Sequence, residues 1–272
     1  MTEIVGRYLE VEGCRTYFES AGSGPAVIFL APAGRETSHW HACLEKYSDR
    51  YYSLALDLPG HGKSGFLPGS SKYLDSIHDI ARFIRTFWRQ LGIERVSVVG
   101  CSLGGNLTYA LAALYPDEVA TIVPLQGAAY TPLVAFAALE FFTHPRVNFI
   151  HHLADNVASL TGSGSSAAGR QYLADSIAGV NPEALKADLT AYGCCDLRSE
   201  IGRIRCPVLA VRGTEDWFVS DEIIDITIRG LTASPVVERA PIPGIGHFPH
   251  LEAPNELFRV VDPFLAKHYP GR

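Results

Sequence analysis

Short apolar runs alternate with longer stretches of helical period along most of the chain. The runs rich in β-branched and aromatic residues predict strands, at residues 7–11, 15–20, 26–31, 51–57, 95–101, 119–126, 206–213 and 236–240. The first two flank Glu12 and Gly13, so we expect them to form a hairpin. Strands that alternate with helices are typical of crossover units, and we therefore predict an α/β protein with a largely parallel sheet.

The clearest helical pattern lies between residues 80 and 91, where apolar residues recur at intervals of three and four. These residues are Ile80, Phe83, Ile84, Phe87, Trp88 and Leu91. The spacing places them on one face of a helix that must pack against the sheet. We therefore interpret Phe87 and Trp88 as core residues and not as a platform for a ligand. Other helices are expected at residues 38–47, directly after residue 102 and at residues 254–268.

The alternation of strands and helices stops between residues 128 and 197. No clear strand occurs there, and helical segments dominate. Residues 161–169 are rich in glycine and serine, which is typical of a flexible segment. We interpret residues 128–197 as a helical insertion into a core that consists of residues 1–127 and 198–272.

Composition and charge exclude several classes of protein. The chain has 272 residues, of which 47% are hydrophobic, so it can bury a sizeable core without disulfides or metal. The formal net charge is -6 and no dense basic run occurs, which argues against nucleic acid as a partner. No apolar run reaches the about 18 residues of a membrane span. Residues 1–7 also lack the basic flank and apolar segment of a secretory signal.

The six cysteines show no C-x-x-C pair and no spacing to a histidine that would complete a zinc site. We therefore expect reduced thiols, no metal and a cytoplasmic protein. Because no membrane span is predicted, we also expect no membrane partner.

The first candidate for chemistry is Ser102, in the sequence Gly100-Cys101-Ser102-Leu103-Gly104. This G-x-S-x-G pattern lies between a predicted buried strand and a predicted helix. A strand that turns sharply into a helix leaves the serine hydroxyl exposed at the edge of the sheet, and the flanking glycines prevent collisions at the turn. The context therefore predicts Ser102 as a nucleophile.

A serine nucleophile needs a base and a carboxylate that orients the base. His247 lies in a loop with two glycines and two prolines after the last predicted strand, and we favour it as the base over His250. Glu215 and Asp216 follow the preceding strand, and we favour Asp216 as the acid. The order along the chain is then nucleophile, acid and base.

The chain resembles the α/β-hydrolase superfamily in these motifs and in two more. Residues 57–64, Asp-Leu-Pro-Gly-His-Gly-Lys-Ser, are similar to the D-x-P-G-x-G-x-S turn of that family, and residues 246–252 are similar to its histidine loop. The resemblance implies a mostly parallel eight-stranded sheet with helices on both faces and a helical cap. It also implies an acid after the seventh strand, where Asp216 falls. Some members place the acid after the sixth strand, but Gln126 is uncharged there.

The resemblance further implies an oxyanion hole made by two backbone N–H groups. Leu103, which follows the nucleophile, is expected to supply one of them. The loop after the third strand, where the family usually has His-Gly, reads Ala31-Pro-Ala-Gly-Arg-Glu36 here. Because proline cannot donate, Ala33 is the expected second donor and Gly34 the next candidate.

In the family, an insertion between the sixth and seventh strands lies above the catalytic edge and sets specificity. The resemblance therefore implies that residues of about 130–195 form a helical cap here. Our candidates for substrate contacts are Gly34, Arg35, Gln126, Tyr130, Phe136 and Phe142. Two questions stay open at this point. The aromatic residues of the insertion either line an apolar pocket or only hold the cap on the core. Arg35 and Glu36 either touch the substrate or form a salt pair that faces solvent.

These residues predict hydrolysis of a carboxylic ester or lactone of a small, largely apolar molecule through an acyl-enzyme, without a cofactor. Hydrolysis of a carbon–carbon bond in a β-diketone-like substrate is the nearest alternative. A cofactor-free lyase or oxygenase, or a ligand receptor on the same fold, are further alternatives. The expected partner is a small-molecule substrate. The oligomeric state is open, and a homodimer is one option.

Overall fold

A computed structural model describes residues 3–132, 144 and 146–271 of the chain. At its centre is one eight-stranded sheet with the strand order β1-β2-β4-β3-β5-β6-β7-β8. The strands are β1 (Val5–Val11), β2 (Cys14–Ala21), β3 (Ala26–Leu30), β4 (Tyr52–Leu56), β5 (Val96–Cys101), β6 (Val119–Leu125), β7 (Val208–Gly213) and β8 (Val237–Ile242). The predicted α/β fold with a mostly parallel sheet is confirmed.

Strand directions follow from the connections. β1 and β2 form the predicted hairpin, and β2 also pairs antiparallel with β4. The remaining neighbours pair in parallel. The register sets Leu30 beside Gly100 and Cys101 beside Leu125, so the carboxyl ends of β3, β5 and β6 meet at one edge of the sheet. In parallel α/β sheets this edge is where ligands bind.

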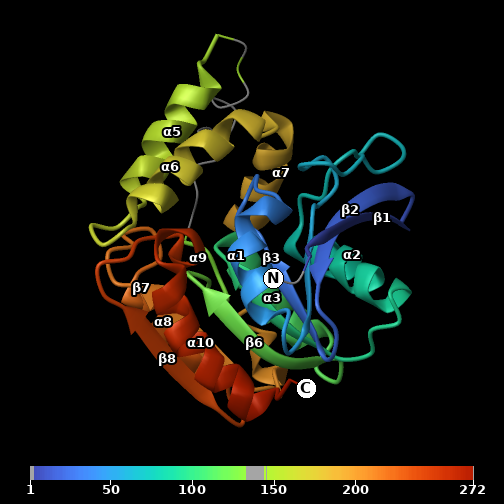
Figure 1. The fold of residues 1–272 in the computed structure, drawn as a ribbon, viewed down its shortest axis with the longest axis vertical. Coiled ribbons are helices and arrows are strands. Elements are labelled where there is room, and N and C mark those ends of the chain that lie inside the picture. The colour runs from blue at the N-terminus through green and yellow to red at the C-terminus, as the bar shows by residue number, and fades with distance from the viewer. Residues whose placement is uncertain (1–2, 133–143, 145, 272) are drawn as a thin grey trace.

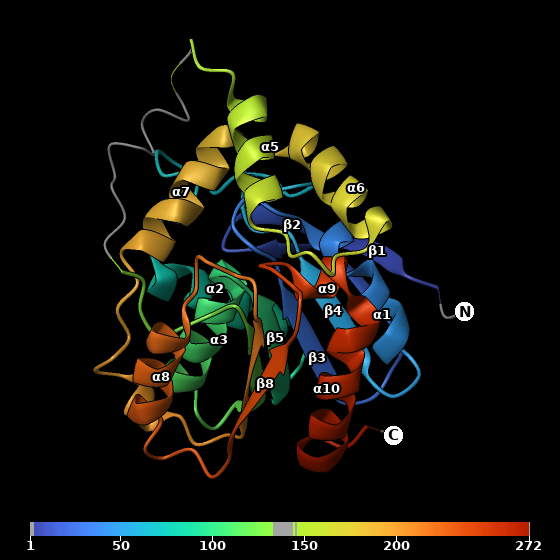
Figure 2. The ribbon, with the colours of Figure 1, turned by 90° about the vertical axis from the view of Figure 1, so that its left-hand side faces the viewer.

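Helices cover both faces of the sheet (Figure 2). One face carries α2 (Ile77–Gln90), α3 (Leu103–Leu114) and α8 (Asp221–Gly230), and the other carries α1 (His41–Tyr47) and α10 (Pro254–His268). The apolar stripe predicted for residues 80–91 is buried along α2 from Ile80 to Trp88, with Phe87 and Trp88 fully inside the core. Its last member, Leu91, is half-buried directly after the helix. Burial of this stripe against the sheet is the main force that holds such an amphipathic helix in place.

A second group of helices lies beyond the carboxyl edge of the sheet (Figure 1). It consists of α5 (Phe149–Ser159), α6 (Ala167–Asp175), the 3₁₀ turn η2 (Ser176–Gly179) and α7 (Pro182–Gly193). The three α-helices are capped at their N-termini by Asn148, Ser166 and Asn181. Each of these side chains accepts a backbone N–H of the first turn. We refer to α5–α7 with η2 as the upper helices.

The segment at residues 161–169 departs from its prediction. We expected it to be flexible because of its glycines and serines, but it packs against the core. The N–H of Gly162 donates to Glu252, and a Cβ on Gly162 would collide with the backbone oxygen of Gly244. Its first glycine therefore serves close approach between two backbones and not flexibility.

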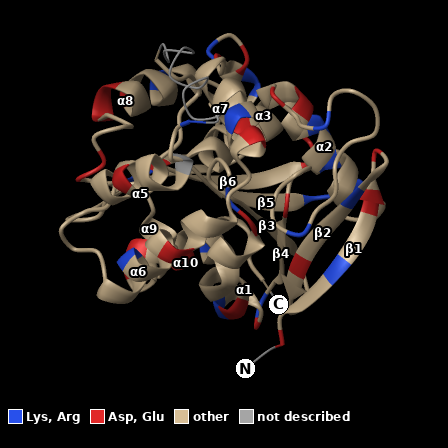
Figure 3. Ribbon diagram, turned by 90° about the horizontal axis from the view of Figure 1, so that it is seen from above, with Lys and Arg blue, Asp and Glu red and all other residues tan. Residues whose placement is uncertain are grey.

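Seen from above, basic and acidic residues are interspersed over the molecule (Figure 3). Within the described ranges, no helix has the length and apolar character that a membrane crossing needs.

Candidate active site

Ser102 lies on a strained turn between β5 and α3. Its φ is 58° and its ψ is -116°, a region that side chains with a Cβ rarely adopt. A Cβ on Gly100 would collide with the backbone of Gly104, and one on Gly104 would collide with the carbonyl of Leu30. Glycine is therefore a steric requirement at both positions. The N–H of Ser102 donates to the oxygen of Leu125 at 2.9 Å, which holds the turn on the edge of the sheet.

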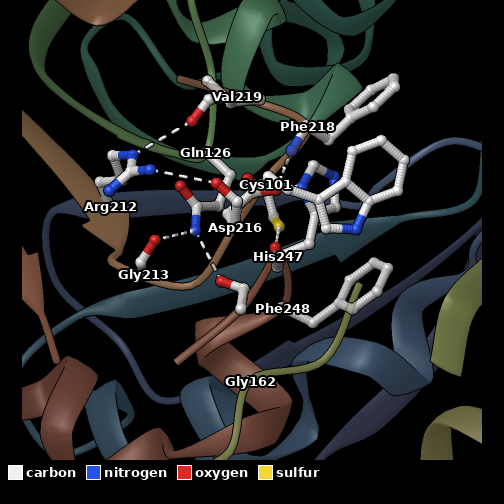
Figure 4. A network of polar contacts seen from close by, with 12 residues as sticks. Cys101, Gln126, Gly162, Arg212, Gly213, Asp216, Phe218, Val219, His247 and Phe248 are labelled. Carbon is white, nitrogen blue, oxygen red and sulfur yellow. Dashed lines mark hydrogen bonds and ion pairs between the residues drawn. The ribbon is translucent and has the colours of Figure 1, made fainter. Parts of the chain in front are cut away.

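Asp216 and His247 form a buried pair at the same edge (Figure 4). The Nδ1 of His247 lies 2.8 Å from the Oδ2 of Asp216, and each residue is only 2% exposed. The other carboxylate oxygen accepts the N–H of Phe218 at 2.8 Å. The carboxylate therefore holds a proton on Nδ1 of the imidazole and leaves Nε2 as the proton acceptor.

The two competing residues lie elsewhere. Glu215 is exposed, and its carboxylate accepts the N–H and the hydroxyl of Ser163. His250 is buried with its ring stacked on Trp40 at 4.2 Å between centroids. Burial, and to a smaller extent His247, lower the pKa of His250 to about 3, so it stays neutral. Neither residue is placed to act on a substrate at Ser102.

The loop that carries His247 is held by a buried acid, Glu252. Its carboxylate accepts the N–H of Gly246 at 2.9 Å, of Phe248 at 2.7 Å and of Gly162 at 2.8 Å. Sequence reasoning assigned no role to Glu252, although an acid at the end of a histidine loop was the available signal. Charge-assisted hydrogen bonds of this kind are about twice as strong as neutral ones.

Gln126 also supports this loop. Its Nε2 donates to the oxygen of Gly246 at 2.6 Å and lies 3.4 Å from the oxygen of Gly213 (Figure 4). Gln126 is fully buried and does not line the cavity described below, and its Nε2 joins the two loops that carry Asp216 and His247. The predicted substrate contact of Gln126 stays a prediction.

Backbone donors for an oxyanion lie on both sides of Ser102. Leu103 opens α3, and the first N–H groups of a helix have no partner within it. In the loop after β3, Gly34 donates to Asp188 Oδ2 at 2.7 Å and Arg35 donates to the oxygen of Pro32 at 3.1 Å. Among residues 32–35 this leaves Ala33 as the candidate second donor and rules out Gly34.

A cavity of about 200 Å³ opens at this edge and contains Ser102 and His247 in its wall. Ala33 and Arg35 line it from the loop after β3. The upper helices, with Leu160 directly after α5, line most of the rest with largely apolar side chains, which are Leu153, Val157, Leu160, Leu185, Leu189 and Tyr192. Residues of the edge loops complete the wall, namely Pro32, Phe218 and Phe248, with Asn156 from α5. Sequence reasoning did not single out the contributions of α5 and α7, although both helices were expected in the insertion.

The other predicted substrate contacts divide as follows. Arg35 lines the cavity, and Gly34 does not. Tyr130 forms a β-bridge with Asp196, Arg198 lies over its ring at 4.6 Å, and it does not line this cavity, so its predicted substrate contact stays a prediction. Phe136 and Phe142 lie outside the described residues.

The alternative of a solvent-facing pair between Arg35 and Glu36 is wrong. Arg35 is only 6% exposed, and the carboxylate of Glu36 accepts the hydroxyl of Ser38 at 2.9 Å.

In the described part of the chain, no group of histidine, cysteine, aspartate or glutamate side chains could hold a metal ion. The remaining arrangement joins a strained serine, a histidine held by a buried carboxylate, two backbone N–H donors and a largely apolar cavity. Such an arrangement can transfer an acyl group to the serine and then to water.

Comparison with known proteins points the same way. Residues 26–144 match the model of a family described as the alpha/beta hydrolase fold. The chain is 28% identical to 2-(acetamidomethylene)succinate hydrolase of Mesorhizobium japonicum over 96% of this chain and 95% of that protein. It is also 28% identical to pimeloyl-[acyl-carrier protein] methyl ester esterase of Nitrosomonas europaea, over 90% and 98% of the two chains. The enol-lactonase structure from Burkholderia xenovorans superimposes with a TM-score of 0.81 at 22% identity, covering 95% and 99%.

Proposed function

This chain belongs to the α/β-hydrolase fold superfamily, and from that premise we propose that it is a serine hydrolase that cleaves a carboxylic ester or lactone. The observation that carries the proposal is the buried Asp216–His247 pair in the cavity that also contains Ser102 on its strained turn. Each part of this arrangement has a defined role in acyl transfer, and a purely structural role explains none of the strain at Ser102.

In the proposed mechanism His247 Nε2 takes the proton of the Ser102 hydroxyl while the oxygen attacks the carbonyl carbon. The N–H groups of Leu103 and Ala33 stabilise the oxyanion, and loss of one such donor typically costs about 3–4 kcal/mol of transition-state stabilisation. The imidazolium then gives its proton to the leaving alcohol. A water molecule, deprotonated by His247, attacks the acyl-enzyme, and the imidazolium returns this proton to the Ser102 oxygen as the acid leaves. Asp216 keeps the imidazole in the required tautomer throughout.

Two further points support ester or lactone substrates. One relative is named as a methyl ester esterase, and a protein of the same fold is named as an enol-lactonase. The largely apolar cavity of about 200 Å³ suits a small acyl or alcohol group. We also propose that the upper helices act as a cap, since they supply most of this wall.

The first test is labelling with a fluorophosphonate probe, which reacts with activated serines. We expect one labelled site, at Ser102, and loss of labelling in Ser102→Ala. Ser70→Ala is the matched control, because Ser70 is exposed and does not line the cavity. Labelling at another residue, or none in the folded protein, would contradict the assignment of the nucleophile.

The second test is a panel of short acyl esters, lactones and β-diketones, assayed with the wild type and with Ser102→Ala. We expect turnover of esters or lactones that is lost in the variant. Turnover of diketones alone would indicate carbon–carbon bond hydrolysis instead. Activity that survives in Ser102→Ala would favour a lyase or oxygenase reaction that needs only His247.

A further inference from the structure

Arg35 is a buried cation in the wall of the candidate catalytic cavity. It follows the oxyanion donor Ala33 by two residues and is only 6% exposed. Among the described residues that line the cavity it is the one lysine or arginine. Its Nη1 donates to the hydroxyl of Ser176 in η2 at 3.3 Å. A guanidinium has five N–H donors, so most of its donors remain for another partner.

No carboxylate in the described ranges lies within ion-pair distance of this guanidinium. Two acids line small clefts beside Arg35, but both have other partners. Asp188 accepts from His61 and from the N–H of Gly34, and Glu36 accepts from Ser38. A buried charge without a counter-charge is costly, because burial removes the water that stabilised it and no opposite charge takes the place of that water.

Neighbouring titratable groups do not supply the missing charge. Burial lowers the pKa of Arg35 to about 10, which still leaves it protonated at neutral pH. Burial and the charge of Arg35 hold the pKa of His39 well below its usual range, so His39 is neutral. The hydroxyl of Tyr172 donates to Ser38, and burial raises its pKa, so it is neutral too. Among the described residues, no group therefore pairs with the positive charge of Arg35.

We propose that Arg35 binds a carboxylate of the substrate. The inference rests on the proposed function, because it places the anion relative to the reacting carbonyl. The carbonyl oxygen would lie at the N–H of Ala33, and Arg35 is two residues further along the same loop. The carboxylate would then be a few bonds from the carbonyl, as in half-esters of short dicarboxylic acids or lactones that carry a carboxylate. Arginine suits this role because its fork matches the two oxygens of a carboxylate.

The test compares monomethyl glutarate with methyl valerate, which is similar in size but neutral. We expect the wild type to have a kcat/KM about 100-fold higher for the half-ester, on the scale of a charge-assisted hydrogen bond that is shielded from water. In Arg35→Gln the ratio of the two kcat/KM values should fall by about the same factor. Arg259→Gln is the matched control, since Arg259 is exposed on α10 and paired with Glu256; it should leave the ratio unchanged.

Binding provides a readout that does not depend on turnover. Monomethyl glutarate should bind to Ser102→Ala in calorimetry and bind at least tenfold more weakly to Ser102→Ala/Arg35→Gln. A wild type that hydrolyses neutral esters as well as half-esters would overturn the role of Arg35 and leave the proposed function intact, whatever the fold of the variant. Half-ester binding that depends on Arg35, without fluorophosphonate labelling of Ser102, would support the role of Arg35 and overturn the proposed function. Failure of the half-ester to bind or to be preferred would refute the inference.

Discussion

Asp188 on α7 joins the upper helices to the core, and its replacement is the sharpest test of how that junction works. Its Oδ2 lies 2.9 Å from Nε2 of His61 and 2.7 Å from the N–H of Gly34. The other ring nitrogen of His61 lies 3.1 Å from the oxygen of Pro59. Both nitrogens thus face oxygens, and the ring satisfies both only when it is doubly protonated. Burial lowers the pKa of His61, but the Asp188 carboxylate, with smaller contributions from the Pro59 oxygen and Asp57, raises that pKa above its usual value.

The size of the effect follows from burial. His61 and Asp188 are 5% and 2% exposed, so removing the carboxylate leaves Nε2 of His61 and the N–H of Gly34 buried without an acceptor. Loss of one member of a buried ion pair typically costs about 3–5 kcal/mol. We expect Asp188→Ala to lower the free energy of unfolding by that amount. Asp188→Asn keeps an acceptor oxygen and the shape, so its loss should be about 1.5–3 kcal/mol.

The assay is urea denaturation at pH 6, followed by circular dichroism and fluorescence. Asp117→Ala is the control, because the side chain of Asp117 is 89% exposed. Its effect should stay within about 0.5 kcal/mol. A loss below about 1 kcal/mol in Asp188→Ala would refute the view that this pair anchors α7.

The same pair predicts a dependence on pH. A group whose pKa is raised by folding stabilises the native state fully below its unfolded pKa, about 6.5 for histidine. This stabilisation is lost as the pH rises through the folded pKa. The difference in stability between the wild type and Asp188→Asn should therefore be largest near pH 6 and shrink toward pH 9. An equal difference at both pH values would show that the charge of His61 plays no part.

Three other changes test the site itself. Asp216→Asn should lower kcat by about four orders of magnitude, because the same change in a serine triad leaves the histidine in the wrong tautomer. The urea midpoint should change little, and near-normal turnover would reopen the choice of acid. Gly104→Ala should cost about 1–3 kcal/mol of stability because its Cβ collides with backbone, whereas Gly179→Ala, with open space around it, should be nearly neutral in the same denaturation assay. Glu252→Gln places an amide N–H against backbone donors, so it should lower the free energy of unfolding by about 1–3 kcal/mol and also lower kcat. The control Glu256→Gln, at an exposed position, should change neither quantity.

The parts of the fold that the sequence predicts well are those set by local physics. The period along α2 is enough to assign its buried face, because each side chain's direction follows from its position in the helix. The turn at Ser102 is predictable for a similar reason. The collisions that require glycine at positions 100 and 104 involve backbone atoms that any strand–turn–helix of this shape brings together. Asp216 was predicted from its position after a strand, and the 2.8 Å contact with His247 now gives that position a geometric reason.

Other features depend on contacts between distant parts of the chain, and local pattern does not predict them. The choice between Ala33 and Gly34 as an oxyanion donor is decided by Asp188, 154 positions away in sequence. Gln126 follows a strand at the catalytic edge, which made a substrate contact reasonable. Its amide bridges loops that approach only in the folded protein. The glycines near residue 162 likewise predict flexibility until the neighbouring backbone is known.

Arg35 shows how such a distant contact changes a functional interpretation. Beside Glu36 in sequence, an arginine is most simply explained as half of a surface salt pair. The fold removes that explanation, because η2 and α6 cover the loop and bury the guanidinium against Ser176, 141 positions away. The carboxylate of Glu36 meanwhile accepts a hydrogen bond from the hydroxyl of Ser38, two residues further along the chain. An arginine that is buried, charged and without a carboxylate partner among the described residues, at the edge of the candidate cavity, is more economically explained by a ligand than by stability. An apolar residue would cost less there. The comparison of half-esters with neutral esters in the wild type and in Arg35→Gln therefore tests whether the substrate carries a negative charge.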